Sequence, residues 1–425
     1  MKNRSLRLLP VLALCGLALP FVAPEKADAI PAFTRQHKTE CATCHTVFPE
    51  LTEQGENFYK NSFVWDTAAV KLSPAAKAAK EKEMKEKEYL ILSSLPEGLP
   101  ISFMGTLNMS YNDAAVSSRK LDLSTRALAL QAGGALADKL GYYVSYNLYT
   151  EGPFDPAFTN APGNNTPNLN ELFLSARHVF NTPVNIKAGR MRPDLSLWKG
   201  FNKTSISPMA TTGYKVGSSQ FFADAPVDAL EANGIVAGRL YMAAGAAKRK
   251  NQDTLEGFGS VSYKIGGADF EGREQAVNLD SDSIFDYLIM TVGAYGYGGK
   301  NKGNSSTATN SFHRFGLETD IRYQRYHAKL ASAFGNDKNP DFSTTSPISR
   351  DSLVVAADVE YLFGSNVIPS FRFEYEDGGN GITRRYIPAV AYAPLQNAKL
   401  VFEYRHDDAP AITNRIFNVG AVISF

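Results

Sequence analysis

Cysteine and tryptophan are scarce in this sequence, and neither sign of charge prevails. The 425 residues include three cysteines and two tryptophans, and 44 Lys and Arg are balanced by 43 Asp and Glu. Balanced charge gives no reason to expect a nucleic-acid partner, which requires clustered excess base. After the N-terminal region, no stretch reaches the roughly 18 apolar residues of a membrane-spanning helix. Phosphate-binding loops, Ser-His-Asp patterns and paired carboxylates do not stand out either.

The N-terminal region has the order of a secretory signal peptide. Lys2, Arg4 and Arg7 precede an apolar stretch at residues 8–22, and Ala27-Asp28-Ala29 follows as a small-x-small cleavage site. The alternative is a membrane anchor, but the apolar run is short for a bilayer and a cleavage site follows it directly. We therefore predict that residues 1–29 are a signal peptide and that the chain is exported. Removal of this segment, which includes the third cysteine, leaves Cys41 and Cys44.

The two remaining cysteines form the motif Cys41-Ala42-Thr43-Cys44-His45. A c-type haem binds covalently through two vinyl groups, each of which takes one thiol, and the adjacent histidine ligates the iron. A Cys-x-x-Cys redox pair would normally open a helix in a βαβ unit, which is not predicted here. A zinc site would need two further ligands, and only His37 is near. The motif therefore predicts one covalent haem c, bound by Cys41, Cys44 and His45, in a small α-helical monohaem domain at residues 30–72.

The sixth ligand of the haem iron is left open by the sequence. The candidates are Met104, His37 and Met84. His37 lies four residues before Cys41, and Met84 lies in a Lys- and Glu-rich helical stretch that Ser73-Pro74 opens. This stretch belongs to a charged helical linker predicted at residues 73–100. Met104 lies near the start of the first predicted strand, on its polar face.

From residue 101 to residue 425 the sequence alternates between apolar and polar residues. In residues 101–111, Phe103, Leu107 and Tyr111 share one face, whereas Ser102 and Asn108 share the other. Such alternation predicts strands with one apolar and one polar side. The pattern recurs at residues 142–150, 171–180, 184–191, 287–297, 313–323, 353–363, 371–375, 400–405 and 416–425.

Tight turns alternate with longer polar loops along this region, as in an outer-membrane barrel. Turns are expected at residues 137–141, 181–183, 364–366 and 394–397, and long loops at 151–170, 300–310 and 335–350. A stripe of alternate residues from Phe417 ends at the terminal Phe425, which is typical of barrels inserted into the outer membrane. We predict an all-β, porin-like transmembrane barrel of about 16 antiparallel strands at residues 101–425. An even number requires residues 192–226 to be one long loop. This loop contains Trp198, and we expect it to fold into the pore as a constriction. The competing architecture is a soluble, secreted β-sandwich or propeller.

The region around the motif resembles the fused outer-membrane monohaem cytochrome–porin family, whose best-known members are iron-oxidising cytochromes. The positions that agree with the family pattern are Pro31, Phe33, Arg35, Gln36, Cys41, Cys44, His45, Pro49, Leu51, Gly55, Phe58 and Lys60. The departures are Thr34, His37-Lys38, Gln54 and Glu56. The resemblance covers about 35 residues specifically. It implies a haem domain that plugs a porin barrel, and it implies iron as the substrate less strongly.

Three functions are compatible with this sequence. The first is electron transfer across the outer membrane, between an extracellular donor or acceptor such as Fe(II) and a periplasmic electron carrier. The second is a diffusion porin with a haem-bearing plug, and the third is a secreted cytochrome with a soluble β-domain. The first would make the chain an electron-transfer protein or an Fe(II)-oxidising oxidoreductase in contact with outer-membrane lipid. His406, Asp407 and Asp408 are weak candidates for a metal site, because such clusters are more often polar loops.

Overall fold

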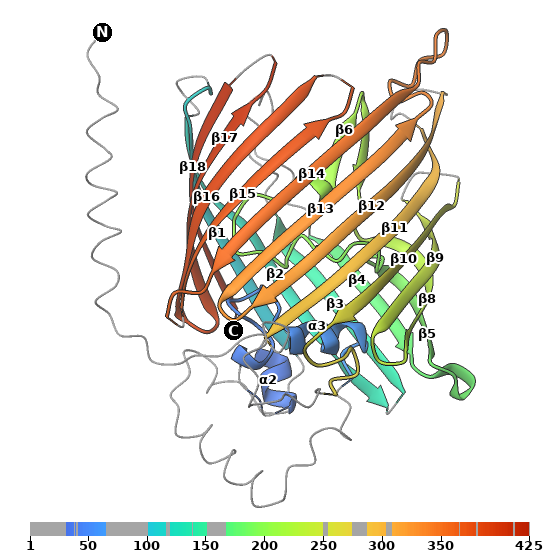
Figure 1. The fold of residues 1–425 in the computed structure, drawn as a ribbon, viewed down its shortest axis with the longest axis vertical. Helices are drawn as coiled ribbons and strands as arrows, with labels where there is room; N and C mark the ends of the chain where they lie inside the picture. Colours follow the sequence, from blue (N-terminus) through green and yellow to red (C-terminus); the bar gives the residue numbers. More distant parts are fainter. Residues whose placement is uncertain are drawn as a thin grey trace, which may run out of the picture.

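The protein forms a closed antiparallel β-barrel of 16 strands (Figure 1). The computed structural model describes residues 31–37, 39, 41–64, 101–115, 120–137, 139–150, 167–249, 254–273, 287–302, 308–364, 366–379, 381–410 and 413–424. The barrel strands are β1 (Ile101–Asn112), β2 (Leu121–Ala137), β3 (Leu140–Thr150), β4 (Asn168–Ala176), β5 (Val184–Met191), β8 (Val227–Val236), β9 (Leu240–Lys248), β10 (Glu256–Ile265), β11 (Leu288–Lys302), β12 (Thr309–Tyr323), β13 (Tyr326–Asp337), β14 (Arg350–Tyr361), β15 (Val367–Asp377), β16 (Ile382–Leu395), β17 (Ala398–Asp408) and β18 (Thr413–Ser424). The predicted porin-like barrel and its number of strands are confirmed.

Alternation along the strands separates an apolar outer face from a polar lumen. On β12, Phe315 and Leu317 are about half exposed, whereas the neighbouring Glu318 and Asp320 are buried. Because successive side chains point to opposite faces, the exposed set faces outward and the buried set faces the lumen. A closed barrel satisfies every backbone group between strands, and an apolar outer band can then face lipid. This arrangement places the protein in the bacterial outer membrane, as predicted.

The first and last strands close the barrel. Met104, near the beginning of β1, pairs with Ser424, at the end of β18. The barrel therefore begins and ends at the same rim, beside the N-terminal helices (Figure 1). Tight turns lie at this rim, such as the one that joins Tyr323 to Tyr326. Phe425 itself lies outside the described residues.

Three details differ from the sequence-based expectation. The strand expected at 171–180 ends at Ala176, because Val179–Asn181 forms a 3-10 turn with Phe180 at a φ of 55°. Alternation also missed several strands, β13 and β16 among them, where small or charged residues interrupt the apolar face. The connection between β10 and β11 is long although it lies at the rim of tight turns. Its described part, residues 266–273, contacts the N-terminal segment, because the side chains of Asn57 and Asn61 donate to the carbonyl oxygens of Asp269 and Phe270.

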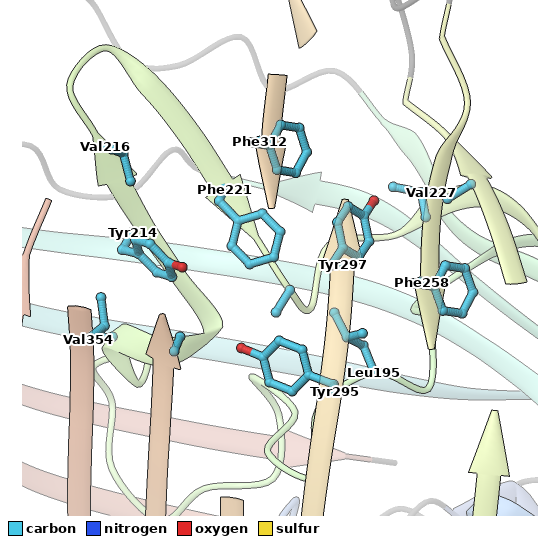
Figure 2. Packing of buried hydrophobic residues seen from close by; sticks show 14 residues of the cluster. Leu195, Tyr214, Val216, Phe221, Val227, Phe258, Tyr295, Tyr297, Phe312 and Val354 are labelled. Carbon is cyan, nitrogen blue, oxygen red and sulfur yellow. The ribbon is translucent and has the colours of Figure 1, made fainter. Parts of the chain in front are cut away.

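The connection between β5 and β8, residues 192–226, folds into the barrel as predicted and is termed the inward loop. It contains a 3-10 turn, Ala210–Thr212, and a hairpin of two short strands, β6 (Gly213–Val216) and β7 (Ser219–Phe222), that is separate from the barrel sheet. Tyr214 and Phe221 from this hairpin pack against lumenal aromatic side chains of β11 and β12 (Figure 2). The inward loop therefore fills part of the lumen with a packed apolar cluster.

The N-terminal segment consists of short helical elements. They are α2 (Pro31–His37), a 3-10 turn η3 (Cys41–Thr43) and α3 (Glu53–Lys60). The Thr52 side chain accepts a hydrogen bond from the Gly55 backbone N–H and so caps α3. No helix among the described residues is long and apolar enough to cross a membrane. The described residues between 31 and 64 are termed the plug, whereas the linker predicted at 73–100 lies outside the described residues.

Candidate haem site at the mouth of the barrel

Cys41, Cys44 and His45 line one cavity between the plug and the barrel wall. The 3-10 turn η3 begins at Cys41, and the backbone N–H groups of Cys44 and His45 both donate to the Cys41 carbonyl oxygen, at 2.9 and 2.8 Å. This tight turn brings both thiols and the imidazole to the same cavity. Neither cysteine forms a disulfide, and burial raises the pKa of Cys44 to about 11. The two thiols are therefore not joined to each other and face the cavity together.

His45 is held in an orientation that suits a metal ligand. Its Nδ1 atom lies 3.2 Å from the backbone carbonyl oxygen of Glu50. Donation from Nδ1 to this carbonyl fixes the tautomer in which Nε2 carries the lone pair. Burial lowers the pKa of His45 to about 4, so the ring is neutral at physiological pH. A neutral imidazole with one nitrogen anchored to a carbonyl is the usual form of a proximal ligand.

The cavity around these residues is large and mostly aromatic. It holds about 1140 Å³ of empty space, part of which is continuous with solvent. Its apolar walls come from the plug, from β3 and β4, and from the inward loop, and they comprise Phe33, Phe48, Phe58, Tyr59, Phe63, Tyr143, Phe173 and Phe201. Ligand pockets are commonly lined by apolar side chains, with a few polar groups that fix the orientation of the ligand. Two thiols at haem spacing, an oriented imidazole and an aromatic chamber together fit a haem c.

Gly55 allows α3 to pack directly on the motif. A Cβ atom at this position would lie 2.1 Å from the Cys44 carbonyl oxygen, so the helix could not approach this closely with any other residue. Thr52 strengthens the same contact, because its backbone N–H donates to the Cys44 carbonyl at 2.9 Å. The helix therefore supports the turn that carries the two thiols.

The three candidates for the sixth ligand are placed differently. Met104 lines the cavity and packs against Cys41 and Phe48, which agrees with its predicted position on the lumenal face of β1. His37 is not among the lining residues, and its ring packs edge-on against Phe58 at 5.2 Å between centroids. Met84 lies outside the described residues. Met104 is therefore the candidate that shares the cavity with His45.

Ion pairs fix the plug to the lumenal wall. Lys264 of β10 lies 2.7 Å from Glu53, and Arg322 of β12 lies 2.9 Å from Glu56. The Arg322 guanidinium also donates to the Leu51 carbonyl oxygen at 3.1 Å. On other sides of the barrel, hydrogen bonds join the plug to β2, β4 and the inward loop through Gln36–Gly133, Ser62–Ser175 and Leu51–Asn202. The plug thus contacts the wall all around this mouth of the barrel.

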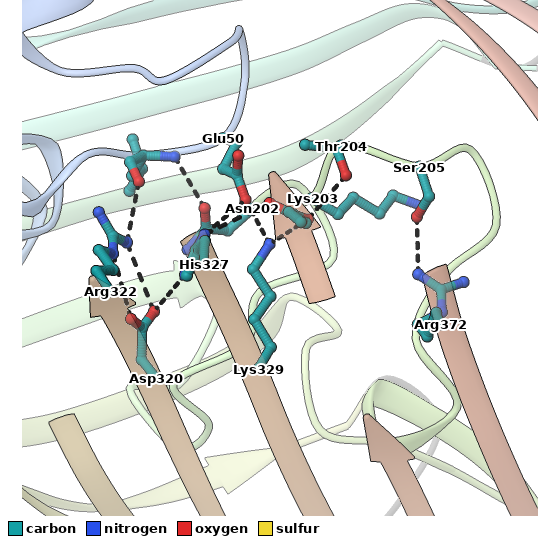
Figure 3. Close-up of polar contacts among 12 residues, drawn as sticks. Glu50, Asn202, Lys203, Thr204, Ser205, Asp320, Arg322, His327, Lys329 and Arg372 are labelled. Carbon is teal, nitrogen blue, oxygen red and sulfur yellow. Dashed lines mark hydrogen bonds and ion pairs between the residues drawn. The ribbon is translucent and has the colours of Figure 1, made fainter. Parts of the chain in front are cut away.

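A second polar cluster lies beside Glu50, and the sequence did not reveal it (Figure 3). Glu50 pairs with Lys329 of β13, which also lies 2.8 Å from Glu360 of β14. His327 contacts both carboxylates and Asp320 as well. The one sequence signal for this cluster was the alternation of His327 and Lys329 on one face of β13. Nothing in the sequence indicated that they would meet Glu50, which lies 279 positions before Lys329.

His406, Asp407 and Asp408, the weak candidates for a metal site, have other partners in the barrel wall. Asp407 lies within β17 and accepts two hydrogen bonds from Arg405, at 2.7 and 2.6 Å. The His406 ring packs against Tyr386 at 6.2 Å between centroids. Asp408 lies at the end of the strand, 4.0 Å from Arg384. The carboxylates therefore pair with arginines of the barrel wall.

Comparison with known proteins supports the barrel. No protein-family model matches the sequence, and no curated protein matches it. Among solved structures, the fold is similar to an anion-selective porin from Comamonas acidovorans, with a TM-score of 0.53 and 11% identity over 76% of this chain and 99% of the porin. A loop L8 deletion mutant of OmpT, an outer membrane protein of Vibrio cholerae, gives a TM-score of 0.51 with the same identity and coverage. The outer membrane channel DcaP of Acinetobacter baumannii gives 0.50, with 11% identity over 76% of this chain and 97% of DcaP.

At this level of identity the likeness establishes the fold alone. The chain is a porin-like outer-membrane β-barrel with 16 strands. The soluble sandwich and propeller are thereby excluded, and so is the secreted cytochrome with a soluble β-domain.

Proposed function

We propose that this protein carries electrons across the outer membrane through one haem c bound by Cys41, Cys44 and His45. The observation that supports this best is that the two thiols, the anchored imidazole and Met104 all line one cavity at the plugged mouth of the barrel. When bound there, the haem would supply a one-electron couple between an extracellular donor such as Fe(II), which becomes Fe(III), and a periplasmic electron carrier.

The residues of the chain would set the position and the environment of the cofactor. The two thiols would anchor it covalently, and His45 would ligate the iron through Nε2, because Nδ1 is fixed on the Glu50 carbonyl. Met104 is the proposed sixth ligand because it lies on the same cavity wall. Thioether ligation raises the reduction potential of a haem, and burial among aromatic side chains excludes water.

The position of the plug suits transfer across the membrane. The apolar band of such a barrel is roughly 25 Å tall, so a redox centre below the rim would be far from an extracellular donor. The ion pairs of Glu53 and Glu56 with lumenal strands hold the plug within the barrel mouth instead. This location shortens the path between the two sides of the membrane.

A diffusion porin with a haem-bearing plug is the alternative function. Such a porin needs a continuous aqueous path. In this chain the plug occupies one mouth, and Tyr214 and Phe221 of the inward loop pack across to β11 and β12. These two obstructions favour electron transfer over diffusion.

The decisive experiment uses the mature protein in proteoliposomes of known orientation. A reduced-minus-oxidised spectrum first establishes that a c-type haem is present. Fe(II) is then added on the side of the long loops, and reduction of the haem is followed by stopped flow. Rapid reduction supports the proposal, and failure of Fe(II) rejects iron as the donor. Failure of every outside donor and acceptor, together with ohmic pores in planar bilayers, would favour the porin.

A further inference from the structure

Glu50, His327 and Glu360 form a group of metal-binding side chains inside the barrel. They come from the plug, β13 and β14, and each offers one ligand atom within 4.8 Å of the others. Figure 3 shows Glu50 and His327 side by side, with Lys329 next to them. Imidazole and carboxylate together are the donor set of many sites for divalent first-row transition metals.

The spacing of these atoms matches a small coordination sphere. His327 Nδ1 lies 3.4 Å from Glu50 Oε1 and 3.4 Å from Glu360 Oε2. Two ligands that are each about 2.1 Å from a metal ion, at a tetrahedral angle, are about 3.4 Å apart. The three side chains therefore need little movement to coordinate one ion.

The other ring nitrogen of His327 is already fixed. Nε2 lies 3.1 Å from Asp320 Oδ2, the arrangement in which a carboxylate orients a metal-binding histidine. With the proton on Nε2, the lone pair of Nδ1 points toward the carboxylates of Glu50 and Glu360. Such a meeting of acceptors is repulsive unless a cation lies between them or the ring carries a second proton.

The two glutamates also leave oxygen atoms available. Glu50 is wholly buried, at 0% exposure, and its Oε2 atom has no hydrogen-bond partner among the described residues. Glu360 Oε1 accepts from Thr204 Oγ1 at 2.8 Å and lies 2.8 Å from Lys329 Nζ, which leaves Oε2 facing His327. A buried carboxylate oxygen without a partner is costly, and a cation that Glu50 holds through both of its oxygens would satisfy Oε2 as well as Oε1, which faces His327.

Lys329 is the cation that a metal ion would have to compete with. Its Nζ atom contacts Oε1 of both glutamates and lies 5.3 Å from the centre of the Trp198 ring. Lys399 also faces Glu50, but its Nζ atom donates to the carbonyl oxygens of Lys203 and Thr204. Removal of the Lys329 charge should therefore strengthen metal binding, whereas removal of a ligand should weaken it.

We propose that Glu50, His327 and Glu360 bind one divalent first-row transition-metal ion, with Fe(II) as the ion that the protein uses. Glu50 connects this site to the haem motif, because its backbone carbonyl accepts the hydrogen bond from His45 Nδ1. Glu50 would then contact both the Fe(II) ion, through its side chain, and the proposed haem ligand His45, through its backbone. The identity of the ion rests on the proposed function, whereas the binding of a divalent ion does not.

Zinc binding tests the site without any redox step. The haem-loaded full barrel is purified in detergent through a tag without histidine, stripped with a chelator and dialysed against Zn(II), and zinc is measured by elemental analysis. We expect one high-affinity Zn(II) per chain. His327→Gln and Glu360→Gln should each weaken binding by at least about tenfold, and Asp320→Asn by about 10–100-fold. Lys329→Met should strengthen it.

His313→Gln is the matched control, because His313 lies exposed on β12, away from the cluster. Folding of each variant is checked by its heat-dependent shift in electrophoresis. Opposite effects of Lys329→Met and Glu360→Gln cannot arise from a general loss of structure. Absence of stoichiometric zinc in the folded wild type, or unchanged affinity in both ligand variants, would overturn the proposal and leave His327 as a protonated bridge between carboxylates.

Anaerobic reduction of the haem by Fe(II) separates the two proposals. If zinc binds as expected but Fe(II) from outside does not reduce the haem, the cation site is correct and the proposed function is wrong. If Fe(II) reduces the haem in the wild type and zinc does not bind, the electron-transfer function is correct and the site is not. When both are correct, His327→Gln should slow reduction at low Fe(II) and approach the wild-type rate at high Fe(II).

Discussion

His45 Nδ1 lies 3.2 Å from the carbonyl oxygen of Glu50, and the Glu50 side chain lies against Lys329 of the barrel wall. One residue of the plug therefore connects the ring that would ligate haem iron to a strand 279 positions later in the chain. This relationship joins the candidate haem site to the barrel, because the orientation of His45 depends on where the wall holds Glu50.

Replacement of the two cysteines tests covalent haem attachment. Cys41→Ala and Cys44→Ala should each leave at most one thioether, and the double variant should lose all haem stain after denaturing electrophoresis, because each thiol serves one vinyl group. His45→Ala is the control that keeps both thiols but loses the proximal ligand. It should retain the stained band and change the visible spectrum. A stained band in the double variant would show that the motif does not attach the haem.

Replacement of Met104 tests the sixth ligand. Met104→Leu keeps the apolar side chain in the cavity but removes the thioether, so the reduction potential should fall and the spectral signature of methionine ligation should disappear. His37→Gln is the matched comparison, because His37 is near the cavity without lining it. If His37→Gln changed the spectrum and Met104→Leu did not, the assignment of Met104 would be wrong.

Neutralisation of the plug anchors should open the barrel. Glu53→Gln with Glu56→Gln removes the charges that face the buried Lys264 and Arg322, at a cost on the order of 1–3 kcal/mol for each lost charged hydrogen bond. The plug should leave the mouth more often, and planar bilayers should show more frequent open-channel events than with the wild type.

Glu271→Gln is the control for this change. Glu271 pairs with the exposed Arg273 in the β10–β11 connection, and exposed ion pairs contribute little. Its conductance should equal that of the wild type. Equal conductance in the double variant as well would mean that these ion pairs do not hold the plug in place.

A charge on the outer face should impair the barrel according to its depth. Leu317→Lys, near the middle of β12, should cost about 2–4 kcal/mol, whereas Thr309→Lys, on the same face at the first residue of the strand, should cost about 0–1 kcal/mol. The yield of folded, heat-modifiable protein in lipid vesicles measures the difference. Equal yields would indicate that this face of β12 does not contact lipid.

Deletion of Phe425 should reduce assembly in the outer membrane. The observed stripe from Phe417 to Ile423 faces outward as predicted, and Phe417 is about half exposed. A terminal aromatic that completes this stripe is the expected recognition signal. The amount of heat-modifiable barrel in outer-membrane fractions, compared with a Phe425→Trp control, tests this. A normal amount from the deletion would contradict it.

The barrel could be predicted because its cause is local. Lumenal and lipid-facing residues alternate within each strand, so the pattern at Ser102, Phe103 and Leu107 already indicated which side faced which environment. The parity of strands also indicated that residues 192–226 form one long loop. The strands that were missed carry small or charged residues, which weaken the apolar signal without breaking the backbone ladder.

The group formed by Glu50, His327 and Glu360 could not be predicted, because residues far apart in the sequence come together in it. Glu50, His327 and Glu360 are adjacent only through the register of β13 with β14 and the position of the plug. The sequence offered only weak candidates that are neighbours in the chain, such as His406 and Asp407, and adjacent residues on a strand point to opposite faces. Cys41, Cys44 and His45 lie within five consecutive residues, so their position at one cavity could be expected from the sequence, whereas the attachment of haem stays a prediction.

The burial of Cys41 has a consequence for biogenesis. In the finished molecule this side chain is 2% exposed, enclosed by Phe48 and by Met104 of the barrel wall. Any maturation enzyme that joins a haem vinyl group to this thiol would need to reach it before the wall surrounds it. Cofactor attachment would therefore precede closure of β1 against β18, and a chain that closed too early would be trapped as an empty barrel. Maturation and membrane insertion would then be ordered steps, with the unassembled periplasmic chain as the only stage at which the cofactor can be acquired.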